Sequence, residues 1–190
     1  MIDQDQTLIE DVRKGNTRRF GVLVDRHKDR ALTLALRLVG DRGEAEELVQ
    51  DAFLRVYKNL AQFRGDARFS TWFYRILYNL CMTRITRRRP GPEPLDGIDE
   101  RRIEVDAGDV QGLERLEEQE LHAMLADAIR KLPERYRTVV TLFYVQEMDQ
   151  EEISHVLELP VGTVKTHLYR ARALLKTMVT DRLKNEVRVA

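Results

Sequence analysis

The apolar residues of this chain recur with the helical period of three to four positions, and no segment alternates as a half-buried strand does. Turn or capping residues, such as Gly40, Asp41 and Pro133, separate successive stretches. The pattern predicts one or two helices over 17–39 and single helices over 8–12, 41–60, 70–84, 113–132, 136–144, 149–157 and 161–184. We therefore expect an all-α protein with two small helical domains, at residues 1–89 and 113–190.

The segment 90–112 lies between the two predicted domains and differs from both. It contains three prolines and four glycines and has no apolar period, which is typical of an extended linker. The formal net charge of the chain is +0, but residues 1–89 carry 18 Lys/Arg against 12 Asp/Glu, whereas 90–112 carry 2 against 7. We expect a flexible acidic linker between domains whose basic patches suit phosphate groups.

Several functional classes find no support in the sequence. The single Cys81 cannot form an internal disulfide, and the four histidines are scattered without metal-ligand spacing. No Gly-rich phosphate loop is present, and no apolar run approaches the roughly 18 residues of a membrane span. The N-terminus lacks the apolar region of a signal peptide. We expect a cytoplasmic protein that is not an enzyme, with no catalytic residues, no metal, no cofactor and no membrane insertion.

The segment from Asp149 to Leu175 reads as a helix-turn-helix. Asp149 followed by Glu152 predicts a capping box for a short helix, Pro160 follows a turn, and a long basic helix comes next. Such a helix fits the major groove of duplex DNA, although an ordinary helical hairpin with a solvated basic face has the same pattern. Glu158 stands where such turns often have glycine or asparagine, which predicts slight backbone strain. The candidate contacts with DNA are Thr163, Lys165, Thr166, Tyr169, Arg170 and Arg172.

An aromatic–arginine segment, residues 63–74, has the sequence FRGDARFSTWFY and continues into a helix with a basic end. Aromatic rings and guanidinium planes stack on unpaired bases, while the cations neutralise phosphate. Trp72 and Phe73 fall on the inner stripe of the helix, so we expect them in the core. Tyr74, Tyr78 and Asn79 fall outside that stripe and are better candidates for contact with DNA.

The predicted helix 41–60 has an apolar stripe that includes Tyr57 and is expected to face the core. The same helix presents an acidic row, which we define as Glu47, Gln50, Asp51 and Leu54. An exposed leucine among charged residues is common and often has no function. Here its position within an acidic surface also suits contact with a protein partner.

Two sets of motifs resemble those of bacterial extracytoplasmic-function (ECF, group IV) RNA polymerase sigma factors. The stretches EELVQDAF at 46–53 and FRGD at 63–66 resemble the second conserved region of that family. The stretches LPERYR at 132–137, PVGTVKT at 160–166 and YRAR at 169–172 resemble the fourth. The two sets occur in the family order, with a linker between them, and the similarity spans nearly the whole chain.

The resemblance implies a sigma factor that binds core RNA polymerase, recognises promoter DNA and aids strand opening. The acidic row would dock on the clamp of the largest polymerase subunit, a further contact would involve the flap of the second, and the basic helix of the helix-turn-helix would read the minus-thirty-five element. The linker would thread toward the RNA exit path, and an anti-sigma factor is an expected partner. The residues implied for the minus-ten element are Phe63, Arg64, Gly65, Asp66, Ala67, Tyr74, Arg75, Tyr78 and Asn79.

Two other functions remain compatible with parts of the sequence. A free-standing helix-turn-helix regulator would bind duplex DNA without polymerase, but it would leave the acidic row and the aromatic–arginine segment unexplained. A helical adaptor that binds only proteins would leave the basic face of the last helix unexplained.

Overall fold

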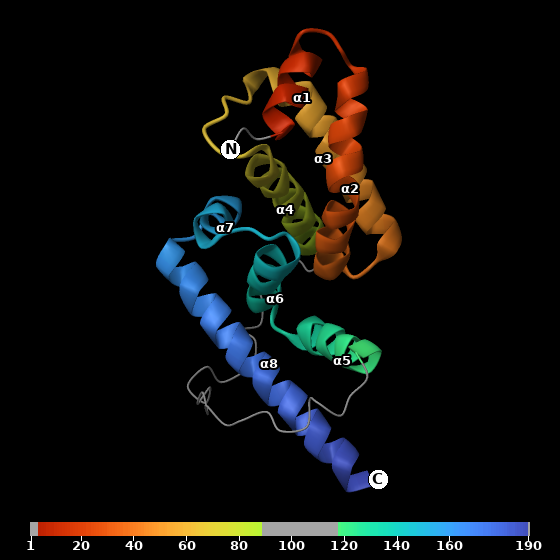
Figure 1. Ribbon diagram of the computed structural model, residues 1–190, viewed down its shortest axis with the longest axis vertical. Helices are drawn as coiled ribbons and strands as arrows, with labels where there is room; N and C mark the ends of the chain where they lie inside the picture. Colours follow the sequence, from red (N-terminus) through yellow and green to blue (C-terminus); the bar gives the residue numbers. More distant parts are fainter. Residues whose placement is uncertain (1–3, 89–117, 190) are drawn as a thin grey trace.

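The computed structural model describes residues 4–88 and 118–189, and the regular elements in these ranges are all helical (Figure 1). The predicted linker at 90–112, together with Arg89 and the predicted helix start at Leu113, lies outside the described residues. The elements are α1 (Gln4–Arg13), α2 (Arg18–Val39), α3 (Arg42–Asn59), a 3-10 turn (Leu60–Gln62), α4 (Phe69–Arg88), α5 (Glu118–Lys131), α6 (Glu134–Val140), a π-helical turn (Thr141–Val145), α7 (Gln150–Leu157) and α8 (Val161–Val189).

The N-terminal half, α1–α4, is built around long helices whose ends follow the expected local rules. Gly40 ends α2 in a left-handed conformation with φ of 76°, which glycine adopts without strain, and its N–H donates to the carbonyl of Leu36. The Asp41 side chain then accepts from the N–H of Glu44 and caps α3. These two adjacent signals place α2 and α3 side by side.

Polar contacts attach α1 to the rest of this half. The carboxylate of Asp5, which is almost fully buried, lies 2.7 Å from His27 Nε2 and 2.6 Å from Arg26 Nη1 on α2. At the other end of α1, Arg13 donates to the carbonyl oxygens of Leu60 and Phe63. The helix therefore holds the start of the loop that leads into α4.

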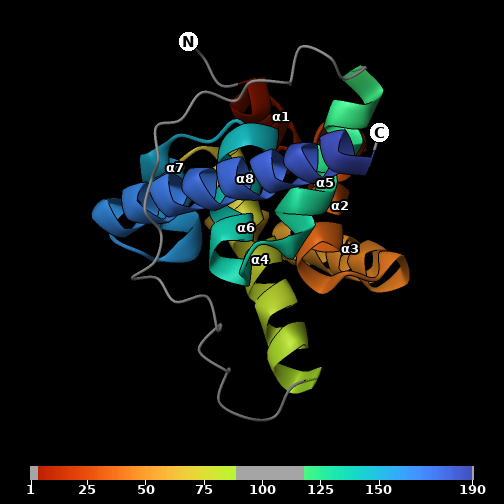
Figure 2. The same ribbon diagram turned by 90° about the horizontal axis from the view of Figure 1, so that it is seen from below.

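The C-terminal half, α5–α8, is organised by its last helix. Seen from below, α8 lies across α6 and α5, and both helices contact it (Figure 2). Tyr136 of α6 is fully buried in a cluster with Leu132, Val140 and Ala171. The helix predicted over 136–144 changes at Thr141 from the α to the π hydrogen-bonding pattern, so its last residues are turned relative to a straight α-helix.

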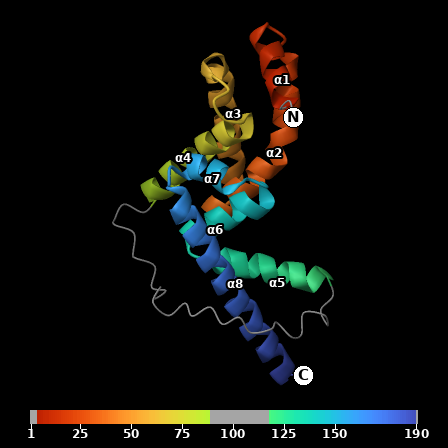
Figure 3. The same cartoon turned by 60° about the vertical axis from the view of Figure 1, so that its left-hand side comes forward.

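The two halves pack against one another. α7 lies beside α4, and α6 and the π turn contact α2 (Figures 1 and 3). One buried apolar cluster includes Phe73 and Leu77 of α4 together with Ile153, Val156 and Leu168 of the helix-turn-helix. The sequence predicted two domains and a linker but gave no indication of this shared core.

Candidate nucleic-acid interface

The helix-turn-helix has the predicted geometry. Asp149 accepts from the N–H of Glu152 at 2.8 Å, while the Glu152 carboxylate accepts from the N–H of Asp149 at 3.0 Å, so the capping box is complete. The predicted strain at the turn is present, because Glu158 adopts the left-handed region with φ of 55°. The apolar side chains expected to join the two helices are buried or half-buried; they are Ile153, Val156, Leu157, Val164, Leu168 and Ala171.

The predicted DNA-contact residues of α8 lie mostly on its solvent-facing side. Lys165, Thr166, Tyr169 and Arg172 are exposed and recur at helical spacing on one face. Thr163 and Arg170 are half-buried at the margins of this face. The hydroxyl of Thr166 donates to the carbonyl of Gly162 at 2.9 Å. The structure thus groups a lysine, an arginine, a tyrosine and a hydroxyl on one accessible surface.

Arg172 is held by aromatic rings that the sequence did not associate with it. Its Nε donates to the hydroxyl of Tyr144 at 2.8 Å, and its guanidinium lies 5.5 Å from the ring centroid of Phe143 and 5.6 Å from that of Tyr144. The π turn places both rings beside α8. Tyr144, at the end of the helix predicted over 136–144, is exposed and forms one side of this arrangement.

The aromatic–arginine segment is mostly core, and two of the residues predicted to contact DNA, Phe63 and Tyr74, are buried. Phe63 is buried and stacks on Trp72 with ring centroids 5.0 Å apart. Tyr74, expected outside the inner stripe, is only 2% exposed. Phe73 is fully buried and stacks on Phe53, as expected for a core residue. Hydrophobic burial fixes these rings, so neither Phe63 nor Tyr74 is accessible to a base in this conformation.

The remaining predicted members of the minus-ten set are accessible. The loop residues Arg64, Gly65, Asp66 and Ala67 are exposed, and Gly65 has φ of 80°, a conformation that favours glycine. On α4, Arg75 and Asn79 are exposed, Tyr78 is half-buried, and Trp72, predicted as core, is also half-buried. Arg68, the last residue of the loop, is exposed as well. The accessible surface is therefore richer in arginine than in aromatic rings.

The acidic row is exposed along one face of α3. Gln50 and Asp51 lie three and four residues after Glu47, Leu54 lies three residues after Asp51, and Leu54 is 55% exposed. Tyr57 continues the same row at 44% exposed, with its ring 4.9 Å from that of Phe20. The sequence pattern placed Tyr57 in the core; its position three residues after Leu54 is the signal that could have placed it on this surface.

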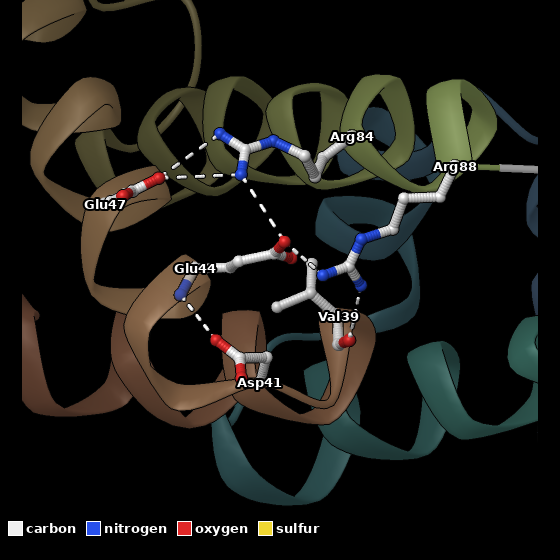
Figure 4. Close-up of polar contacts among 6 residues, drawn as sticks. All are labelled: Val39, Asp41, Glu44, Glu47, Arg84 and Arg88. Carbon is white, nitrogen blue, oxygen red and sulfur yellow. Dashed lines mark hydrogen bonds and ion pairs between the residues drawn. The ribbon is translucent and has the colours of Figure 1, made fainter.

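Two arginines of α4 contact Glu47 of the acidic row and the neighbouring Glu44 (Figure 4). Arg84 lies 3.5 Å from the Glu47 carboxylate and 3.7 Å from that of Glu44. Arg88 pairs with Glu44 and donates to the carbonyl of Val39 at 3.3 Å, at the end of α2. These contacts join the basic end of α4 to the first turns of α3, so Glu47 is oriented by Arg84 while remaining exposed.

Other reactive or metal-binding groups add nothing to this surface in the described ranges. Burial raises the pKa of the Cys81 thiol to about 12, because the thiolate would be poorly solvated. Within residues 4–88 and 118–189, no group of three or more His, Cys, Asp or Glu is arranged to hold a metal ion. None of the helices described there combines the length and the apolar character needed to cross a membrane.

The chain matches two family descriptions, Sigma-70 region 2 over residues 23–90 and Sigma-70 region 4 over residues 122–175. Relatives with similar sequences include the ECF RNA polymerase sigma factor SigW of Bacillus subtilis, 36% identical with 91% of this chain and 95% of SigW covered. The ECF RNA polymerase sigma-E factor of Escherichia coli is 34% identical, with 92% of this chain and 94% of that protein covered. Among solved structures, CnrH in complex with the cytosolic domain of CnrY has a TM-score of 0.66 and 27% identity, covering 92% of this chain and 96% of CnrH. Both conserved regions are thus present in one chain of family length, and the chain belongs to the ECF RNA polymerase sigma factors, alternative sigma factors that direct transcription initiation.

Proposed function

We propose that the three exposed surfaces of this sigma factor divide the work of promoter recognition. The acidic row of α3 docks on the clamp of the largest polymerase subunit, and the C-terminal half contacts the flap of the second. The loop 64–67, with Arg75, Tyr78 and Asn79 on α4, binds the minus-ten element as single strand. The exposed face of α8 reads the minus-thirty-five element in the duplex.

The observation that carries this proposal is the separation of charge among these surfaces. The α3 face combines carboxylates with exposed Leu54, a composition that suits a protein partner better than phosphate. The α8 face combines Lys165 and Arg172 with exposed Tyr169, which suits a DNA groove. A free-standing regulator would have no use for the first surface, and a protein adaptor none for the second.

Reconstituted transcription tests the proposal. Core polymerase with the purified chain should initiate at specific promoters among genomic fragments, and core polymerase alone should not. Lys165→Ala combined with Arg170→Ala should abolish this activity, whereas an adaptor would retain it. Tight, specific binding to duplex promoter DNA without polymerase would instead favour the regulator.

Two further variants separate docking from strand opening. Asp51→Arg reverses the charge at the centre of the acidic row and should weaken association with core polymerase first. Asn79→Ala should impair strand opening, measured with permanganate or a fluorescent base, more than it impairs association. Unchanged core binding of Asp51→Arg would exclude the docking surface, and equal loss of both activities for Asn79→Ala would exclude its assignment to the minus-ten element.

The same proposal includes the group IV class and an anti-sigma partner. CnrH, which resembles this chain over most of its length, was solved in complex with the cytosolic domain of CnrY. We infer that an anti-sigma factor binds both halves of this chain and holds it inactive. We place the protein in the cytoplasm, where RNA polymerase acts, and assign it no chemistry of its own. Co-purification from cells grown without stress, followed by mass spectrometry, would identify such a partner.

A further inference from the structure

Arg172 of α8 differs from the arginines of α4 in the partners that hold it. Arg84 and Arg88 form ion pairs with glutamates, which offset their charge. Among the residues that the structure describes, no carboxylate pairs with Arg172, and its partners are the hydroxyl of Tyr144 and the rings of Phe143 and Tyr144. Aromatic rings orient a guanidinium without neutralising it. Arg172 is therefore held in place with its positive charge uncompensated.

The hydrogen bond between Arg172 and Tyr144 leaves donors of both side chains available. Nε of Arg172 donates to the hydroxyl, so this bond does not use the outer N–H groups of the guanidinium. The hydroxyl accepts the bond and can donate its own proton to another acceptor. Tyr144 is 53% exposed, and Arg172 is exposed as well. A guanidinium beside a hydroxyl that it polarises offers donors suited to an anionic oxygen.

The turn that carries the two rings has an unusual backbone. In the π-helical turn Thr141–Val145, the N–H of Gln146 donates to the carbonyl of Thr141 at 3.1 Å, five residues back. Such turns are rare and frequently lie at functional sites. Phe143 is half-buried and packs against the apolar core, and its ring meets that of Tyr144 edge to face with centroids 5.0 Å apart. The turn thus ties an exposed tyrosine to a rigid support.

Arg172 lies on the face of α8 that is proposed to read bases, but further along the helix. Lys165, Tyr169 and Arg172 follow one another at intervals of four and three residues. The distance from Lys165 to Arg172 is roughly 10 Å along the axis, at about 1.5 Å per residue. The major groove is about 12 Å wide. With Lys165 at the base edges, Arg172 and Tyr144 therefore lie at the rim of the groove, where the phosphates are.

We propose that Arg172 and Tyr144 form a binding site for one backbone phosphate of duplex promoter DNA. The guanidinium supplies the charge, the Tyr144 hydroxyl supplies a second hydrogen bond, and Phe143 is a positioning residue for both. The site rests on the proposed function of α8 and deepens it, because it assigns Arg172 to the backbone and adds Tyr144 to the interface. A contact of this kind sets the register of the helix on the duplex and carries no sequence information.

Promoter duplexes with one uncharged methylphosphonate test the site. The full chain is bound to core polymerase, and the phosphates across the minus-thirty-five element of a promoter that this holoenzyme transcribes are replaced one at a time. The wild type should lose affinity several-fold at one position. Tyr144→Phe and Arg172→Ala should be insensitive at that position, because they have already lost the contact. The same profile of losses in all three proteins would overturn the proposal.

The salt dependence of binding separates the two side chains. Arg172→Ala should weaken binding several-fold and reduce the slope of log affinity against log salt by about 1, because one phosphate keeps its counterions. Tyr144→Phe removes an uncharged donor and should weaken binding without changing the slope. The control is Arg130→Ala, which removes an exposed arginine of α5 that pairs with Asp127 and should change neither quantity. A Tyr144→Phe protein that binds as tightly as the wild type would exclude the hydroxyl from the site.

The role of Phe143 has its own readout. Phe143→Leu keeps an apolar side chain against the core and removes the ring beside the guanidinium. It should reduce the sensitivity to methylphosphonate at the same position as Tyr144→Phe does and leave the other positions unchanged. A loss of affinity spread evenly over all phosphates would mean that the ring is merely structural, and it would remove Phe143 from the site.

Base substitutions keep the phosphate site apart from the proposed function. Each change in the minus-thirty-five element should cost the wild type and Tyr144→Phe the same factor in affinity, and an altered base preference in Tyr144→Phe would overturn the assignment to phosphate. Transcription by Lys165→Ala combined with Arg170→Ala would refute the proposed function of α8 itself. If that double variant is inactive but Tyr144→Phe has the wild-type phosphate profile, the phosphate site alone is refuted.

Discussion

Replacing Tyr74 by phenylalanine should stabilise the protein. The side chain is 2% exposed, its hydroxyl has no hydrogen-bond partner among the residues that the structure describes, and burial raises the pKa of that hydroxyl well above its usual value of 10. Burying a hydroxyl without a partner costs about 1–3 kcal/mol. The substitution removes this cost and forfeits only a few dispersion contacts of one oxygen atom, at about 0.1–0.2 kcal/mol each.

We therefore expect a net gain of about 1 kcal/mol in the free energy of unfolding, which corresponds to a rise in Tm of roughly 2–4 °C for a chain of this size. Urea and thermal denaturation followed by circular dichroism would measure it. Tyr57→Phe, at an exposed position on α3, is the control and should change stability by less than about 0.5 kcal/mol. A loss of about 1 kcal/mol in Tyr74→Phe would refute the reasoning, because it would mean that the hydroxyl is satisfied.

The same variant tests whether the Tyr74 hydroxyl contacts the minus-ten element. If Tyr74 is a core residue, as the structure places it, Tyr74→Phe should support strand opening at the wild-type rate, in contrast to Asn79→Ala. A more stable protein that opens promoters poorly would show instead that the hydroxyl leaves the core and contacts DNA.

Three other substitutions or modifications test local features. Burial raises the pKa of Asp5, but hydrogen bonds and charge from His27 and Arg26 outweigh that effect and leave it below 3.8. The contribution of Asp5 to the free energy of unfolding is therefore present above pH 3.8 and is lost as the pH falls through the lower pKa that Asp5 has in the folded protein. Asp5→Asn should cost about 2 kcal/mol at pH 7 and progressively less in acid, measured by urea titrations. Cys81, whose pKa is about 12, should resist alkylation at pH 8 until the protein is unfolded. Asp149→Ala removes the capping box and should destabilise the protein by about 1 kcal/mol in the same titrations, whereas exposed Glu151→Ala should have a smaller effect.

The parts of the fold that the sequence predicted well are those that depend on local signals. Gly40 followed by Asp41 gave the boundary between α2 and α3, and Asp149 with Glu152 gave the start of α7, because caps involve residues that are neighbours in the chain. The acidic row was also predicted correctly, since helical spacing alone places its members on one face.

The sequence predictions of burial fail at residues whose exposure depends on neighbours in space that lie far away in the chain. Tyr74 lies beside the inner stripe of α4, where the helical period alone predicts an exposed side chain. Because α4 contacts α2, α3 and α7, this side of the helix is covered as well, and Tyr74 is buried. Tyr57 lies on the stripe, yet its ring contacts Phe20 of α2 and remains 44% exposed. Periodicity shows that a helix has an apolar face, but it does not show how many elements pack around that helix.

The packing of α7 on α4 could not be derived from either helix alone, and the strained Glu158 shows why it matters. The sequence identified Glu158 as unusual because a turn at that position favours glycine, but its partner Arg75 is more than 80 positions away in the chain. A glycine at 158 would relieve the backbone and still end α7, so local stability does not explain the glutamate. The contact with Arg75 does, because it gives the side chain a function that only the carboxylate can perform.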